Sequence, residues 1–329
     1  MLDLDSSSSI VYRHVQKHEE KEALDLWCPV FKHTIDHEGR YFLHDASPCY
    51  QEGDTLGAWH NDQLVSTIHI RRFLLQCHED NKKYLCAGIT NVVTRNEYQR
   101  KGLSRHLLQM VIDKFNESND FDISILGTGK PDHFARFGWE EVPRPMKIII
   151  NWTSDDTLSK TNVQWHSVSN LSHENIELLF DIHSNYPRIY QMERSPHSIF
   201  YHWVKFRWQI DEAIVCLYEK GYVVIGSPDN DEDICILEWR APNKNSEQKL
   251  LSLAASEIRQ RHGLTKHIQL FALPQYMTID ELTKWAGSIQ IGTSSDIMMR
   301  NIRLSSEIYH RIKTSFSNGR AVFWSGDYF

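Results

Sequence analysis

The chain has 329 residues, of which 41% are hydrophobic and 24% charged, and its formal net charge is −7. The length predicts two domains, the apolar fraction is enough for folded cores, and the negative charge gives no support to a nucleic-acid partner. No apolar run approaches the roughly 20 residues of a membrane span, and the polar first ten residues are not a signal peptide, so we expect no membrane contact and a cytoplasmic location.

Six cysteines occur without a C-x-x-C pair. This pattern predicts reduced and mostly buried thiols, and no metal site.

In the first half, the spacing of apolar residues predicts an α/β arrangement. Residues 19–31 have a helical spacing, and residues 103–115 form an amphipathic helix. Residues 55–60 and 63–75 predict an antiparallel pair with a turn between them, because His60, Asn61 and Asp62 are turn-forming. The remaining predicted elements are strands at 10–14, 83–94, 121–126 and 139–152 and a short helix at 132–137.

A polar stretch at residues 154–162 indicates a linker, and a second α/β pattern follows it. Its helices are predicted at 175–183, 195–206, 246–263, 279–285 and 307–314, and its strands at 213–217, 221–227, 234–240, 268–271, 289–303 and 321–324. The order of elements imitates that of the first half. We therefore expect a tandem repeat of one fold, with domains at 1–153 and 163–329.

The segment from residue 87 to residue 105 carries the most chemical information. A strand ends near residue 94, a loop follows, and a helix begins at once. Such a loop offers free backbone N–H groups to a pyrophosphate, and the helix dipole adds favourable charge. Gly102 lets a phosphate approach the backbone, and Arg100, Lys101 and Arg105 can add charge-assisted bonds. The alternative is an ordinary strand, loop and helix, but a basic first turn opposes the helix dipole unless an anion compensates it.

Two motifs in this half resemble those of the GNAT superfamily of N-acetyltransferases. Gln99, Gly102 and Ser104 occupy the fixed places of GNAT motif A, Q/R-x-x-G-x-G/A, with the small residue Ser104 in place of the usual Gly or Ala. The run from His133 to Trp139 is similar to motif B. With its second half, the chain resembles the tandem-GNAT enzymes, which include the enhanced-intracellular-survival acetyltransferases and the fungal free-lysine acetyltransferases.

This resemblance implies a mixed, mostly antiparallel sheet with flanking helices, followed by a degenerate GNAT-like domain. It implies acetyl-CoA as cofactor and CoA as product. Pantetheine would lie where the fourth strand splays from the fifth, and the loop amides would hold the pyrophosphate. The implied cofactor residues are Val92, Val93, Thr94, Gln99, Arg100, Lys101, Gly102, Leu103, Ser104 and Arg105.

The second half has no glycine in the connection at residues 241–245. We therefore expect it to bind no CoA and to form a wall of the substrate cleft, the alternative being a dimerisation or stability domain.

The catalytic acid and base are less clear from the sequence. Many GNAT enzymes place a glutamate on the fourth strand, but residues 86–94 contain no acid. In the survival-type enzymes a motif B tyrosine is the acid and the terminal carboxylate is the base. Phe134 stands in the tyrosine position, so His133, Tyr98 or water must substitute. Asp327 or the carboxylate of Phe329 is a candidate base, the alternative being a frayed tail.

The region after the first helix usually covers the acceptor in this superfamily. Trp27 and Phe31 belong to that helix, and Asp36 and Glu38 can bind a second ammonium group of the acceptor. His69 can face the cleft, although a lone histidine on a strand is more often structural. The predicted function is N-acetylation of a small primary amine of the lysine, polyamine or aminoglycoside type. The alternatives are a protein or peptide N-acetyltransferase and a non-catalytic acyl-CoA sensor.

Overall fold

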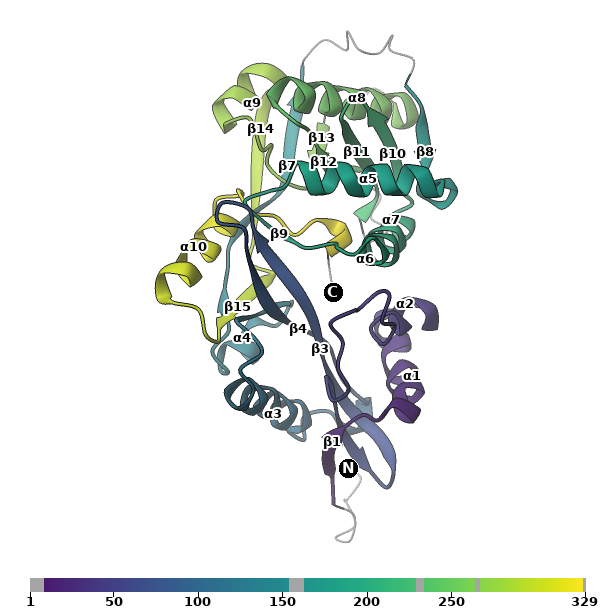
Figure 1. The fold of residues 1–329 in the computed structure, drawn as a ribbon, viewed down its shortest axis with the longest axis vertical. Coiled ribbons are helices and arrows are strands. Elements are labelled where there is room, and N and C mark those ends of the chain that lie inside the picture. The colour runs from purple at the N-terminus through teal and green to yellow at the C-terminus, as the bar shows by residue number, and fades with distance from the viewer. Residues whose placement is uncertain (1–8, 154–162, 229–233, 264–266, 328–329) are drawn as a thin grey trace.

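The computed structural model describes residues 9–153, 163–228, 234–263 and 267–327. These residues form two mixed sheets with helices on their faces (Figure 1). The expected linker at 154–162 lies outside the described residues. Among the helices that the structure describes, none is long and apolar enough to cross a membrane.

The first sheet has the strand order β1-β2-β3-β4-β5-β15-β6, and β9 pairs with one end of β3. Strands β4 and β5 run parallel, whereas β2, β3 and β4 form an antiparallel meander. Its strands are β1 (Val11–His14), β2 (Thr55–His60), β3 (Gln63–Cys77), β4 (Lys82–Thr94), β5 (Ile123–Gly127), β6 (Glu140–Glu141), β9 (Tyr190–Met192) and β15 (Ile297–Asn301).

The second sheet has the order β14-β7-β13-β12-β11-β10-β8, and it repeats the plan of the first. Its parallel pair, β12 and β13, is joined by the long helix α8, as β4 and β5 are joined by α3. Its strands are β7 (Arg144–Trp152), β8 (Trp165–Ser167), β10 (Ile214–Tyr218), β11 (Gly221–Gly226), β12 (Cys235–Arg240), β13 (His267–Leu270) and β14 (Gly287–Ser294). The expected tandem repeat is confirmed.

The two halves exchange one strand each. Strand β7 comes from the first half of the chain but lies between β13 and β14 of the second sheet. Strand β15 comes from the second half but lies between β5 and β6 of the first sheet. The boundary expected at the linker therefore does not coincide with the division between the two sheets.

Helices cover both faces of the first sheet. On one face lies α3, whose buried side chains are Leu103, Leu107, Leu108, Val111, Ile112 and Phe115, as its amphipathic spacing predicts. On the other lie α1, which buries Ala23, Leu26 and Trp27, and α10. The helices are α1 (Glu20–Phe31), α2 (Ile35–Gly39), α3 (Leu103–Glu117), α4 (Pro131–Ala135), α5 (His173–Asn185), α6 (His197–Ile199), α7 (Phe206–Ile210), α8 (Lys244–His262), α9 (Ile279–Ala286) and α10 (Ser306–Ser317).

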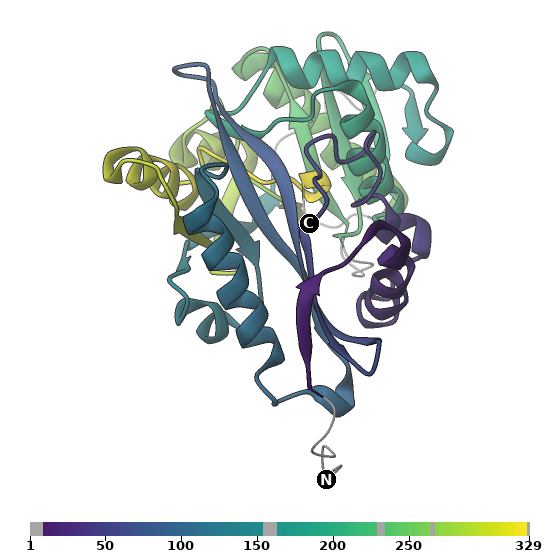
Figure 2. The ribbon, with the colours of Figure 1, turned by 60° about the horizontal axis from the view of Figure 1, so that its bottom comes forward.

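Three local predictions have clear outcomes. The turn between β2 and β3 forms as expected, with Asn61 and Asp62 both at positive φ. The helix expected at 195–206 is α6, a π-helical stretch at Phe200–Lys205 and then α7. The strand expected at 321–324 is wrong. Those residues are buried without strand pairing, and a 3₁₀ turn, Ser325–Asp327, follows them near the middle of the molecule (Figures 1 and 2).

Candidate active site

Strands β4 and β5 separate part of the way along the first sheet. They pair only from Cys86 to Gly88, opposite Ile123 to Ile125, although β4 continues to Thr94. Beyond that point β4 contains a bulge, where its register against β3 shifts and Asn91 takes a positive φ of 50°. A bulge bends and twists a strand, so the backbone from Ile89 onward turns away from β5. The result is an open strand edge beside a gap.

The loop after β4 leads directly into α3. Two of its residues are left-handed, Arg100 with φ 62° and Gly102 with φ 83°. Gly102 is the N-cap of α3 and supplies no side-chain cap, and the first turn of the helix contains no acid. The first N–H groups of α3 are therefore left to a ligand, and left-handed backbone of this kind forms an anion-binding concavity.

A cleft of about 1060 Å³ joins the open edge of β4 to this loop. It is lined by these predicted residues: Phe31, Val92, Thr94, Gln99, Arg100, Gly102, Leu103, Ser104, Arg105 and His133. Two predicted cofactor residues do not line it. Val93 is buried in the apolar core, and the ammonium group of Lys101 lies 4.9 Å from the ring centroid of Tyr98.

Sequence reasoning missed several residues of the cleft. They are Ile89, Thr90 and Asn91 on β4, and Gly127, Thr128, Gly129 and Lys130 after β5. The two glycines and the lysine that follow a buried strand were a signal for the second group. The described lining contains no carboxylate but three cations, Arg100, Arg105 and Lys130. A cleft of this charge, ending at a helix N-terminus, suits an elongated anion such as CoA.

His133 and Phe134 on α4 also line the cleft, and the largely buried ring of Phe134 packs against Trp139. Burial lowers the pKa of His133, and the nearby Arg105 adds to this effect. The imidazole is therefore neutral at pH 7 and can accept a proton.

A buried carboxylate lies one side chain behind the cleft. Glu38 on α2 is 2% exposed, and its Oε2 accepts a 2.9 Å hydrogen bond from the Asn91 amide. Its Oε1 lies 2.6 Å from Nδ1 of His33. The arrangement places a carboxylate directly behind the bulge of β4, at a point where the cleft is lined by Asn91.

The same carboxylate belongs to a grouping that resembles a metal site. Potential ligand atoms of His33, His37 and Glu38 lie within 4.8 Å of one another. Burial lowers the pKa of His37 to about 2, and Arg40 and Arg207 contribute to this shift. Those two cations also oppose a divalent ion. Both carboxylate oxygens of Glu38 already have partners, His33 and Asn91. These contacts favour a role for Glu38 as a buried negative charge and not as a metal ligand.

The other predicted acceptor residues do not line the cleft. Trp27 is fully buried, and its indole N–H donates to Thr67 at 2.8 Å. His69 is enclosed by aromatic rings, its Nδ1 lies 2.8 Å from the Thr55 hydroxyl, and burial lowers its pKa to about 4. These features match the structural alternative for His69. Asp36 is exposed on α2.

Asp327 lies in a buried ion-pair network between the halves. Arg194 donates to its carboxylate at 2.8 Å, and the Trp324 N–H donates at 3.0 Å. Burial raises the pKa of Asp327, against the effect of Arg194. Its carbonyl oxygen accepts a hydrogen bond from Arg71 on β3. Asp327 does not line the cleft, and it anchors the C-terminal segment. Phe329 lies outside the described residues.

The second sheet lacks a matching cofactor loop. At the start of α8 the side chain of Asn243 accepts a hydrogen bond from the N–H of Ser246, and Glu247 is buried in the first turn. This helix N-terminus is thus capped by the chain itself and carries an acid, which opposes phosphate binding.

Comparisons with known proteins agree with this geometry. Residues 11–142 match the family described as "Acetyltransferase (GNAT) domain". A comparison with curated protein sequences finds no match.

Solved structures resemble nearly the whole chain in fold. A GCN5-related N-acetyltransferase from Kribbella flavida has a TM-score of 0.64 at 16% identity, over 90% of this chain and 72% of that one. Eis1 from Mycobacterium abscessus has a TM-score of 0.60 at 14% identity, over 89% and 74% of the two chains. N-myristoyltransferase from Saccharomyces cerevisiae, solved with myristoyl-CoA, has a TM-score of 0.53 at 10% identity, over 92% and 81%.

The splayed strands, the free N–H groups at the start of α3 and the family match are features of a transferase that uses an acyl-CoA donor. Residues 11–142 form a GNAT N-acetyltransferase domain, and a second GNAT-like sheet accompanies it.

Proposed function

We propose that this chain transfers the acetyl group of acetyl-CoA directly to a small primary amine that carries a further positive charge, of the lysine, polyamine or aminoglycoside type. One observation carries the proposal. The charged residues that line the cofactor cleft are cations, but Asn91 also lines it, and its side chain holds the buried carboxylate of Glu38. A negative charge behind the lining at that point favours a cationic acceptor and opposes an anionic one. The likeness to tandem-GNAT enzymes supports the same class of acceptor.

In this proposal the cofactor supplies an activated acetyl thioester. The open edge of β4, from Val92 to Thr94, holds the pantetheine, and the loop from Gln99 to Arg105 holds the pyrophosphate. Val93 and Lys101 contribute through their backbone, because their side chains do not line the cleft. Binding both reactants in one cleft makes the transfer effectively unimolecular.

The transfer forms an amide N–C bond and breaks the thioester C–S bond, so one proton must leave the amine and the thiolate must gain one. His133 lines the cleft and is suited to carry this proton, because its imidazole is neutral at pH 7. Tyr98, the other side chain expected for this role, also lines the cleft, and its hydroxyl lies 2.7 Å from Nδ1 of His60. Asp327 has a different role in this proposal, since its ion pair with Arg194 holds the C-terminal segment. The carboxylate of Phe329 stays a prediction from the family resemblance.

The second half would bind no CoA, so the chain would bind one CoA molecule. None of the second half's described residues lines the cleft. It supports the site from outside, through strand β15, which pairs along β5, and through the Asp327 carbonyl oxygen, which accepts a hydrogen bond from Arg71 on β3.

The test is CoA release from acetyl-CoA with a panel of acceptors: lysine, spermidine, an aminoglycoside, a lysine-containing peptide, and Nα,Nε-diacetyllysine methyl ester, whose amines are both blocked. We expect turnover with at least one small cationic amine and none with the blocked ester. Turnover with the peptide alone would favour the protein or peptide acetyltransferase. Tight binding of acetyl-CoA without turnover on any amine would favour the sensor.

A further inference from the structure

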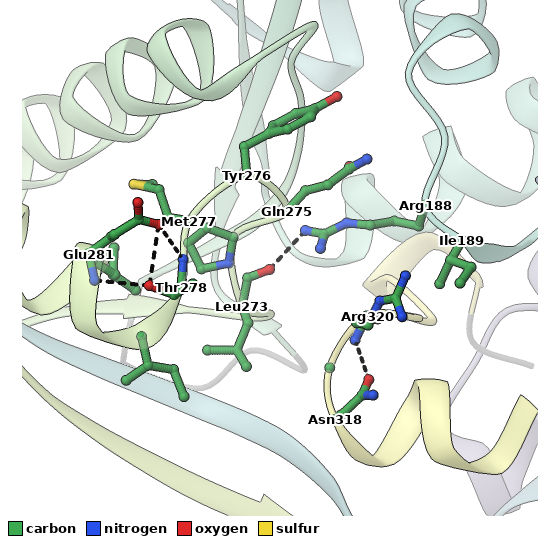
Figure 3. A pocket seen from close by; sticks show the side chains of 14 residues that line it. Arg188, Ile189, Leu273, Gln275, Tyr276, Met277, Thr278, Glu281, Asn318 and Arg320 are labelled. Carbon is green, nitrogen blue, oxygen red and sulfur yellow. Dashed lines mark hydrogen bonds between the residues drawn. The ribbon is translucent and has the colours of Figure 1, made fainter. Parts of the chain in front are cut away.

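A second cavity lies far along the chain from the acetyl-transfer cleft. It has a volume of about 590 Å³ and lies between three segments (Figure 3). These are Arg188 and Ile189 before β9, residues 273–279 leading into α9, and residues 318–320 after α10. None of these residues belongs to the cofactor site.

The feature that distinguishes this cavity is a buried arginine. Arg188 is 2% exposed, and its guanidinium lies in the cavity wall beside Leu273 and Gln275 (Figure 3). Nη2 donates to the carbonyl oxygen of Leu273 at 2.9 Å, and Nε has no hydrogen-bond partner. Within the described part of the chain, no ion pair of Arg188 is found. Burial lowers the pKa of Arg188 to about 10, so the group remains charged at pH 7.

The acids near this cavity are engaged elsewhere. The carboxylate of Glu247 accepts hydrogen bonds from the Trp239 indole N–H and from the backbone N–H groups of Gln275 and Tyr276. Glu281 caps α9 and pairs with Lys244 at 2.8 Å. Within the described residues neither carboxylate forms an ion pair with Arg188, although the nearby charge of Glu247 raises the pKa of Arg188 against the effect of burial. A buried guanidinium without a directly paired anion is costly.

The rest of the lining suits a small organic anion. Arg320 lies at the rim, and among the residues that the structure describes its ion pair is a long, exposed contact of 3.4 Å with Glu79. Leu273 and Met277 provide apolar wall. An arginine fork binds the oxygens of a carboxylate or a phosphate, while apolar walls accommodate a hydrocarbon portion.

We propose that this cavity binds a small organic anion, whose carboxylate or phosphate group pairs with Arg188 and whose apolar portion lies on Leu273 and Met277. Such a ligand lies next to the C-terminal segment, because the Trp324 ring is 5.2 Å from the Arg188 guanidinium. Trp324 also donates its backbone N–H to Asp327, which anchors that segment. Occupancy therefore stabilises the segment that reaches β3.

The test is isothermal titration with two probes, butyrate and inorganic phosphate, on the full chain saturated with CoA, so that the phosphate loop is already occupied. Arg188→Met removes the charge and keeps the length of the stem. Ile279→Glu places a negative charge in the cavity wall at the first position of α9, where an acid suits the helix dipole. Leu178→Glu on α5 is its matched control, because both residues are 46% exposed.

We expect at least one probe to bind, at least tenfold more weakly in Arg188→Met and Ile279→Glu, and unchanged in Leu178→Glu. Binding of butyrate alone identifies a carboxylate ligand, and binding of phosphate alone identifies a phosphorylated one. If Arg188→Met does not fold, the proposal is tested by comparing the probe affinity of Ile279→Glu with that of its control, Leu178→Glu. Binding of neither probe to the wild type, or equal binding to all variants, would overturn the proposal.

Discussion

Replacing Gly102 by glutamate tests the proposed phosphate site at the residue that begins helix α3. Gly102 has φ +83°, and a Cβ built there meets no atom within 4 Å. The fold therefore pays only for the left-handed backbone, about 1–2 kcal/mol for a residue other than glycine. The added carboxylate stands at the N-terminus of α3, where the phosphates would bind. At an effective dielectric of 20 two like charges about 4 Å apart repel by roughly 4 kcal/mol, and screening by solvent leaves about half of that or more.

A loss of about 2–4 kcal/mol corresponds to CoA binding that is weaker by roughly 30-fold to 700-fold. The assay is isothermal titration with CoA, with the fold checked by circular dichroism. Gly263→Glu is the matched control, because Gly263 has φ +82° and equally open space but follows α8 in the second half. The wild type and the control should each bind one CoA per chain. Wild-type affinity in a folded Gly102→Glu variant, or the same loss in the control, would refute the phosphate-loop assignment.

The remaining predictions concern the acceptor and pH. Glu38→Gln should raise the KM for a cationic amine about tenfold, as expected for losing a charge several ångströms away, and leave CoA affinity unchanged. Asp36→Asn, on the same short helix but exposed, should change neither. His69 is neutral when folded and takes up a proton on unfolding, so stability should be lost as pH falls from 6.5 towards about 4. Between pH 7.5 and 5.0 the unfolding free energy in urea should fall by about 2 kcal/mol more in the wild type than in His69→Gln. An equal KM in Glu38→Gln and Asp36→Asn would contradict the role of Glu38. Equal falls of the unfolding free energy with pH in the wild type and His69→Gln would contradict the buried, neutral state of His69.

Local patterns were enough to predict the strand, loop and helix that would hold the cofactor. The helix α3 follows from six apolar residues at helical spacing, and the basic residues at its start indicated an anion. The turn between β2 and β3 follows from Asn61 and Asp62, which tolerate the positive φ that they adopt. Both features depend on residues that are close together in the sequence, so a single sequence is enough to predict them.

Other parts of the site depend on contacts between distant residues. The bulge at Asn91 arises from the register of β4 against β3. The asparagine by itself does not predict a bulge. The burial of His69 depends on rings contributed by residues 27, 41, 42 and 50, which the sequence places in a helix and an irregular segment. Strand exchange is equally hidden, because β7 and β15 have the alternating or continuous apolar pattern of any inner strand.

Through the exchange of strands, the second half supports the proposed cofactor site from behind. Every residue of β5 from Ile123 to Gly127 is paired with β15, whereas only Ile123 to Ile125 are paired with β4. A strand that lost its partner on one side without gaining one on the other would leave backbone groups unsatisfied. Because β15 holds β5 along its whole length, β4 can bend away at Ile89 and open the cleft. The Thr128 N–H, which follows β5 at the cleft, also donates to the Asp296 carbonyl of the second half at 2.7 Å. The second sheet therefore supports the gap in which the cofactor would lie, although its own helix α8 begins without a phosphate loop.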